Sequence, residues 1–135
     1  MLFGTFDILH LGHIHLFKQA KEYGDRLVVV VARDINVKKI KGFLPLHNEK
    51  ERFGFLNEIK IIDEVLLGYK TNRLKIIQKV RPDVIALGYD QRMDVHELGK
   101  KITEFNLETE IVKLKPFQKM KHKTSRIKEY LEKNI

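Results

Sequence analysis

The chain has 135 residues, enough for one domain with a substantial hydrophobic core. It contains no cysteine, which excludes disulfides, thiolate metal ligands and cysteine nucleophiles. The longest apolar run, residues 27–32, is too short to span a membrane, and the N-terminus lacks the basic leader of a signal peptide. We therefore expect a single domain over residues 1–135, located in the cytoplasm.

The net charge is +8, from 26 Lys and Arg residues against 18 Asp and Glu residues, and a basic surface can bind nucleic acid. The basic residues are dispersed, however. The densest blocks, residues 38–41 and 119–123, fall in predicted loops with no aromatic strand beside them to stack bases. A basic pocket for a small anionic substrate explains these blocks equally well. We expect no nucleic-acid partner and no membrane association.

Strands and helices alternate along the chain. The β-branched run over residues 27–32 is typical of a parallel strand covered on both faces. Asn48 is a good helix cap, and Pro82 ends a short helix. The expected elements are a strand stub at 2–3 (truncated here, or continued upstream of this Met), a helix over 13–23, a strand over 27–32, a basic loop over 37–47, a helix over 48–59, a strand over 64–67, a helix over 74–80, a strand over 84–87, a helix over 94–105, an edge strand over 110–114, a loop over 116–123 and a helix from 124 onward.

This alternation predicts an α/β fold, with an open, five-stranded, mostly parallel sheet and helices on both faces. The last helix should bury Ile127, Tyr130 and Leu131. Ligands of such sheets bind beyond the carboxyl ends of the strands. Candidate polar groups follow three strands: residues 5–13 after the first, Asp34 after the second and Asp90 after the fourth. The sequence therefore predicts a ligand site at this edge.

The segment from residue 4 to residue 13 is the strongest candidate for that site. His10 and His13 bracket Gly12 at the point where a strand gives way to a helix. A helix N-terminus offers unpaired backbone N–H groups and the positive end of the helix dipole, so it suits a phosphate. Glycine lets the backbone approach a ligand closely. We predict that both imidazoles face a triphosphate, which indicates a nucleotide-handling enzyme.

Three blocks, in this order, resemble the small cytidylyltransferase-like nucleotidyltransferases: GTFD at 4–7, HLGH at 10–13 and KTSRI at 123–127. The segments VARD at 31–34 and ALGYDQ at 86–91 look like the archaeal-type FAD synthases, which are FMN adenylyltransferases. The resemblance covers essentially the whole chain. It implies a Rossmann-like nucleotidyltransferase fold, ATP and FMN as substrates, Mg²⁺ or another divalent cation on the triphosphate with unknown protein ligands, and a homodimer.

In this family a substrate phosphate oxygen attacks the α-phosphorus of a nucleoside triphosphate, and pyrophosphate leaves. The resemblance implies that His10 and His13 donate hydrogen bonds to the triphosphate, and that Thr5 and the Phe6 backbone hold the α-phosphate. The other residues that it places in the site are Leu11 and Gly12 beside the nucleotide, Lys41 and Arg52 on the incoming phosphate or the departing pyrophosphate, Asp90 on the nucleoside, the backbone near Phe117 along the base, and Thr124 and Ser125 on phosphate. Lys123 stands where relatives with a glycerol phosphate or choline substrate usually have Arg, which leaves a charge contact but not a bidentate one.

Three alternatives stay open, the third being a non-catalytic nucleotide sensor. The first uses CTP and glycerol 3-phosphate, or another small alcohol phosphate, on the same motifs. FMN needs a flat apolar slot, and without tryptophan its walls would come from Phe43, Phe53, Phe55 or Tyr89, each equally plausible as core. The second is a nucleic-acid-binding module, because the motif at 10–13 and the stretch 119–125 are also similar to the signature blocks of class I aminoacyl-tRNA synthetases.

Overall fold

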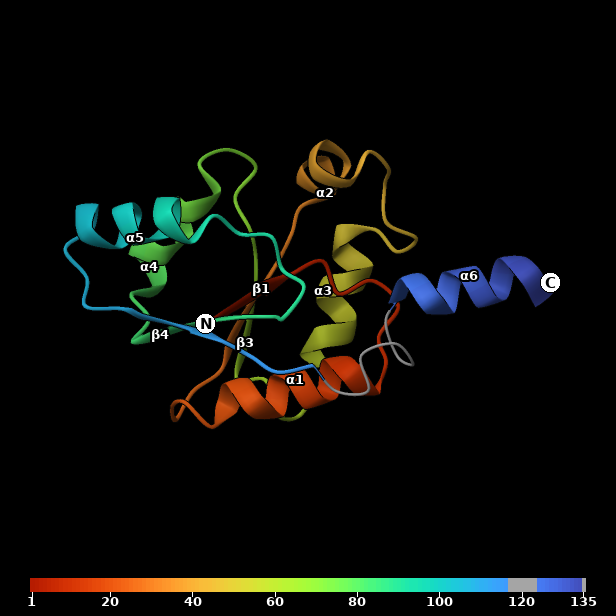
Figure 1. Cartoon of the computed structure of the whole chain (residues 1–135), viewed down its shortest axis with the longest axis horizontal. Coiled ribbons are helices and arrows are strands. Elements are labelled where there is room, and N and C mark those ends of the chain that lie inside the picture. The colour runs from red at the N-terminus through yellow and green to blue at the C-terminus, as the bar shows by residue number, and fades with distance from the viewer. Residues whose placement is uncertain (117–123, 135) are drawn as a thin grey trace.

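The computed structural model describes residues 1–116 and 124–134, and a five-stranded sheet forms its centre (Figure 1). The order of the strands is β3-β2-β1-β4-β5, and every pairing is parallel. The α/β prediction is confirmed, and so is the edge position of β5. The strands are β1 (Leu2–Gly4), β2 (Val28–Val31), β3 (Glu64–Leu67), β4 (Val84–Leu87) and β5 (Glu110–Lys113).

Helices cover both faces of the sheet, because the side chains of successive strand residues point to opposite sides. Val29 and Val31 of β2 join a core beneath α1 and α3, whereas Val30 joins a second core beneath α4 and α5. Figure 1 shows α1 on one side of the sheet and the α4–α5 pair on the other. The helices are α1 (Leu11–Lys21), α2 (Asp34–Lys41), α3 (Glu49–Asn57), the 3₁₀ turn η1 (Arg73–Lys75), α4 (Ile76–Val80), α5 (Val95–Glu104) and α6 (Thr124–Asn134).

Local capping sets several helix ends. Asn48 caps α3, as predicted, and forms a reciprocal capping box with Glu51. Asp94 accepts hydrogen bonds from the first backbone N–H groups of α5. The helix predicted over 74–80 begins as the 3₁₀ turn η1 and ends at Val80. The left-handed backbone of Arg81 (φ 50°) caps it, just before Pro82.

The prediction of a basic loop over 37–47 is wrong in its first half, because α2 extends to Lys41. Its inner face packs Val37, which is 3% exposed, and its lysines lie on a helix rather than in a loop. Gly42 ends this helix at φ 83°, where its N–H bonds the Lys38 carbonyl at 2.8 Å. The glycine that indicated a loop is therefore a helix C-cap.

Helix α6 projects from the body of the molecule (Figure 1). Its predicted buried stripe is wrong: Ile127 is half-buried, but Tyr130 is 65% exposed and Leu131 is 42% exposed. The stripe has helical spacing, yet the helix extends beyond the core that would have covered it. Among the described residues, no helix has both the length and the apolar character needed to cross a membrane.

Candidate active site

A cleft of about 1330 Å³ opens at the carboxyl ends of β1 and β4. The chain order of the strands reverses between these two neighbours, so the cleft lies at the switch point where sheets of this kind bind ligands. The cleft contains many of the residues predicted for the site. The predicted residues in its lining are Thr5, Phe6, His10, Gly12, His13, Lys41, Asp90 and Ser125.

The two histidines of the motif cap their own helix. His10 is the N-cap of α1, and its Nδ1 accepts a hydrogen bond from the Gly12 N–H at 3.0 Å. His13 Nδ1 in turn accepts from the His10 N–H at 3.2 Å, which completes a capping box built from two imidazoles. The rings lie 4.0 Å apart. One of the first backbone N–H groups of α1, that of Gly12, is therefore bonded to His10 in this structure.

These hydrogen bonds fix the ring chemistry of both histidines. A neutral imidazole that accepts through Nδ1 carries its proton on Nε2, so each neutral ring presents an Nε2–H donor on the edge away from the helix backbone. Burial, helped by the charge of His10, lowers the pKa of His13 from 6.5 to about 4. At neutral pH, His13 is thus an uncharged hydrogen-bond donor.

The ring of Phe6 packs against His13 and holds the histidine pair in place. The backbone of Phe6 is left-handed, with φ 52°. The buried ring packs edge-on against His13, with 5.8 Å between the ring centroids, and at a tilt against Phe17, with 5.4 Å between the centroids. Gly4 makes room for that ring, because a Cβ there would come within 2.5 Å of it. Gly4 and Phe6 of the GTFD block therefore hold His13 in place, in addition to any backbone contact with a ligand.

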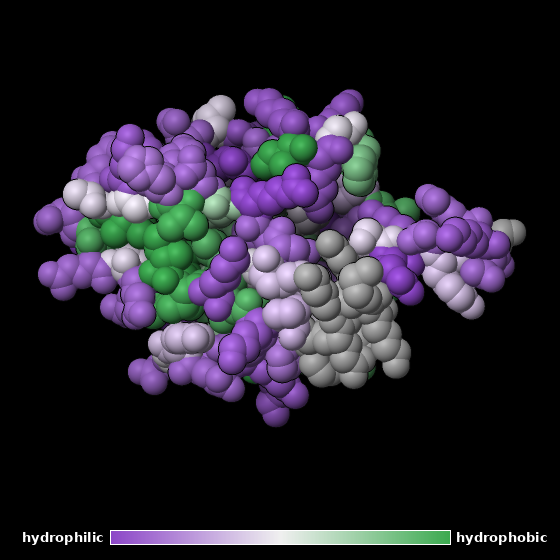
Figure 2. All heavy atoms as spheres, in the orientation of Figure 1, coloured by the Kyte–Doolittle hydropathy of each residue, from purple (hydrophilic) through white to green (hydrophobic). Residues whose placement is uncertain are grey.

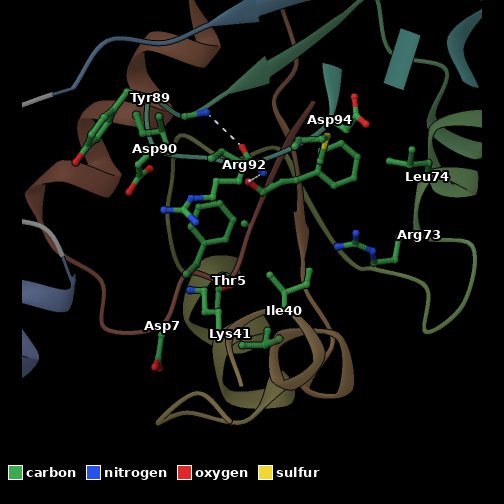
Figure 3. A pocket seen from close by; sticks show the side chains of 18 of the residues that line it. Thr5, Asp7, Ile40, Lys41, Arg73, Leu74, Tyr89, Asp90, Arg92 and Asp94 are labelled. Carbon is green, nitrogen blue, oxygen red and sulfur yellow. Dashed lines mark hydrogen bonds between the residues drawn. The ribbon is translucent and has the colours of Figure 1, made fainter. Parts of the chain in front are cut away.

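The loop after β4 is fastened to β1 across the switch point. The Gln91 side chain donates to the Phe3 carbonyl at 3.2 Å and accepts from the Gly88 N–H at 3.3 Å. This bridge holds Asp90 at the cleft. Burial, together with the charge of Asp90, raises the pKa of the neighbouring Tyr89. Figure 3 shows Arg92 in the middle of the cleft, with Asp7 and Lys41 toward one end and Arg73 and Leu74 toward the other.

Positively and negatively charged side chains lie close together at the end of the cleft that contains Lys41. Desolvation in the cleft lowers the pKa of Lys41, and so does the charge of Lys128, while Asp7 and Asp90 offset part of this effect. Lys128 also lines the cleft, from α6. Two ammonium groups on separate helices therefore lie close enough to act on each other, as expected at a site for a polyanion.

Arg52, predicted to bind phosphate, lies behind the wall of the cleft. It is fully buried and donates to the Thr5 carbonyl at 2.8 Å, to the His47 carbonyl at 3.0 Å and to Asp34 Oδ1 at 2.7 Å. Its guanidinium joins two backbone carbonyls and one carboxylate from three segments of the chain, so this position gives no support to a phosphate contact. Asp34, the polar residue after β2, is its partner.

The remaining predicted residues divide into two groups. Leu11 is 60% exposed and its side chain is outside the cleft lining. Phe117 and the side chain of Thr124 lie outside the described part of the chain, so their predicted roles stay predictions. Of the four aromatic walls considered, Phe43 and Tyr89 line the cleft, whereas Phe53 packs against the core and Phe55 contacts the His47 ring.

The sequence reasoning missed Lys128, His47, Arg73 and Arg92. Lys128 had a usable signal, because it follows Ser125 by three residues and so shares its face of α6. His47 had none, since its role depends on a contact with Asp7 forty residues away.

Comparison with known proteins agrees with this geometry. The model of the cytidylyltransferase-like family matches residues 1–130. A FAD synthase of Thermoplasma volcanium is 40% identical over 95% of this chain and 89% of its own, and a FAD synthase of Pyrococcus abyssi is 44% identical over 92% and 85%. The crystal structure of the lipopolysaccharide core biosynthesis protein of Thermoplasma volcanium superposes with a TM-score of 0.80 at 43% identity, covering 87% of this chain and 95% of that one. The chain belongs to the cytidylyltransferase-like family of nucleotidyltransferases.

Proposed function

We propose that this protein is an FMN adenylyltransferase, which makes FAD and pyrophosphate from FMN and ATP. The relatives of 40–44% identity that carry the name FAD synthase support this choice, because the chain aligns with them over most of its length. The observation that carries the proposal in the structure itself is the size and division of the cleft.

The cleft is larger than a single nucleotide needs. Its volume of about 1330 Å³ exceeds the range of roughly 300–1,000 Å³ common for one small ligand. One end holds the histidines, Lys41 and Ser125. The other end runs between η1 and α5 and combines apolar side chains, Leu74, Met93 and Phe105, with basic and amide groups. A flat ring system with polar edges, such as the isoalloxazine of FMN, suits this second end.

The proposed reaction needs no strong general base. An oxygen of the FMN phosphate, already an anion, attacks the α-phosphorus of ATP, and the bond from that phosphorus to the β-phosphate oxygen breaks. The leaving pyrophosphate takes the electron pair. His10 and His13 would donate Nε2–H bonds to the phosphate oxygens, with Lys41 as a mobile charge on the incoming phosphate or the departing pyrophosphate. Catalysis thus comes from alignment and charge neutralisation.

We propose that Mg²⁺ enters with the triphosphate. Among the described residues, no group of three or more His, Asp or Glu side chains forms a metal cage. Asp90, which lines the cleft, would hold such an ion through one of its bound waters. When bound, the ion would neutralise charge on the triphosphate.

A matrix of substrates tests the proposal against its rival. The purified protein would be given ATP or CTP, each with FMN or glycerol 3-phosphate, in Mg²⁺ buffer, and pyrophosphate release would be followed with product identification. Pyrophosphate and FAD only from the ATP and FMN pair is the expected result. CDP-glycerol without FAD would replace the proposal with the cytidylyltransferase alternative.

We also propose a homodimer that acts in the cytoplasm. Figure 2 shows apolar side chains gathered on the face beside α5 and surrounded by hydrophilic ones. Patches of this kind commonly mark protein contacts. Light scattering on the full chain tests the dimer, and a monomer mass at micromolar concentration would contradict it.

A further inference from the structure

The Asp7 carboxylate joins three parts of the chain. In the loop after α2, the backbone N–H groups of Leu46 and His47 donate hydrogen bonds to it at 2.8 Å and 3.0 Å. The Nδ1 atom of His47 also lies 3.2 Å from Asp7 Oδ1. From α6 the carboxylate accepts the Lys128 ammonium at 3.1 Å. Its side chain is 6% exposed. Three residues before the first histidine of the motif, this carboxylate therefore ties the loop after α2 and helix α6 to the loop after β1.

Asp7 is held in its ionised form. Burial raises its pKa, but the two backbone N–H bonds and the Lys128 charge outweigh burial, so the net pKa lies below the ordinary value. The ion pair with Lys128 therefore persists across the neutral range. Because the Asp7 carboxylate is nearly buried, water screens this ion pair less than it screens a pair on the open surface, and the pair is stronger for that reason.

Lys128 is the partner that brings α6 to this carboxylate. It is half-buried, and its ammonium also lies 5.7 Å from the centre of the Phe43 ring. Ser125, one turn earlier on the same face, lines the cleft with it. The end of α6 beyond Lys128 is exposed, including Tyr130 and Leu131. The helix thus meets the body near its beginning, where Ser125 and Lys128 lie.

We propose that the Lys128–Asp7 ion pair is a latch that holds the start of α6 over the phosphate end of the cleft. Lys128 acts as a positioning residue: it fixes the helix so that Ser125 faces the triphosphate beside His10 and His13. The inference rests on the proposed nucleotidyl transfer, since the latch serves that reaction. Without it, α6 loses its alignment with the cleft and opens more often.

The test compares Lys128→Met with Lys133→Met, a matched change on the same helix. Lys133 pairs with Glu129 and its side chain is 70% exposed, away from the cleft. Lys128→Met should lower kcat/KM for FAD formation by roughly 10- to 100-fold, since small misplacements of binding groups have effects of this size. Lys128→Arg should restore most of the activity, and Lys133→Met should leave it unchanged.

A double-mutant cycle separates the latch from a direct phosphate contact. If Lys128 acts through Asp7, then Asp7→Asn removes most of the effect of Lys128→Met, and the two changes are strongly non-additive. If Lys128 instead binds substrate itself, its substitution loses the same factor in both backgrounds, which overturns the proposal. Melting temperatures of all variants identify any that fail to fold.

Hydrogen exchange of the ligand-free protein gives a readout that needs no substrate. Lys128→Met should speed amide exchange in α6, whereas Lys133→Met should not. Equal exchange in the two variants overturns the latch. If the wild-type protein makes no FAD while this difference in exchange is seen, the proposed function fails and the latch stands.

Discussion

Acidification should reveal the neutral state of His13 as a loss of folding stability. In the unfolded chain this imidazole titrates near 6.5, whereas in the folded protein burial and the His10 charge lower its pKa to about 4. Between these values the unfolded state binds the extra proton, so stability falls as the pH falls. With one pKa unit worth about 1.4 kcal/mol, lowering the pH from 7.5 to 4.5 removes about 2.5 kcal/mol through His13.

His13→Asn is the matched control. The Asn side-chain oxygen can take the place of Nδ1 and accept the His10 N–H, which preserves the capping box but removes the titrating ring. Urea unfolding of both proteins at pH 7.5 and 4.5 isolates the effect, because the other titrating groups are common to both. The stability of the wild type relative to the variant should drop by about 2.5 kcal/mol at the lower pH. A difference that stays constant within about 0.5 kcal/mol would show that His13 titrates normally and refute the reasoning.

Three further predictions follow from the same contacts. His10→Asn and His13→Asn each keep the Nδ1-like acceptor and lose the Nε2–H donor, so kcat for FAD formation should fall about 10²- to 10³-fold with an unchanged circular dichroism spectrum; activity within threefold of wild type would exclude the donor role. Gly4→Ala forces a methyl group against the Phe6 ring and should destabilise the fold by about 1–3 kcal/mol in urea titrations, and no change would mean that the ring moves freely. Arg52→Met leaves a carboxylate and two carbonyls without their donor and should lower stability by about 3–5 kcal/mol; a change in KM alone, at full stability, would return Arg52 to the phosphate site.

The position of the site was readable from the sequence because its parts are local. The β-branched run at 27–32 predicts a strand buried on both faces, and the observed alternation of Val29, Val30 and Val31 between two cores confirms it. In a parallel sheet the carboxyl ends of the strands meet at one edge, so the motif after β1 and Asp90 after β4 had to converge.

What the sequence left out depends on contacts between distant segments. The place of Arg52 in a helical sequence pattern is the same whether its guanidinium binds a ligand or, as here, donates to the carbonyls of two other segments. The helical spacing of Tyr130 and Leu131 does not tell that α6 extends past the core. The role of Lys128 needs Asp7, which lies 121 residues away. No local pattern carries these pairings.

The most direct test of the central claim is the fate of labelled ATP in the presence of FMN. The purified protein would be given ATP labelled at the α-phosphate in one reaction and at the γ-phosphate in another, and the products separated. The α-label should appear in FAD and the γ-label in pyrophosphate, in equal amounts. Label from the γ-phosphate in a phosphorylated product, or no FAD from either reaction, would contradict adenylyl transfer to FMN.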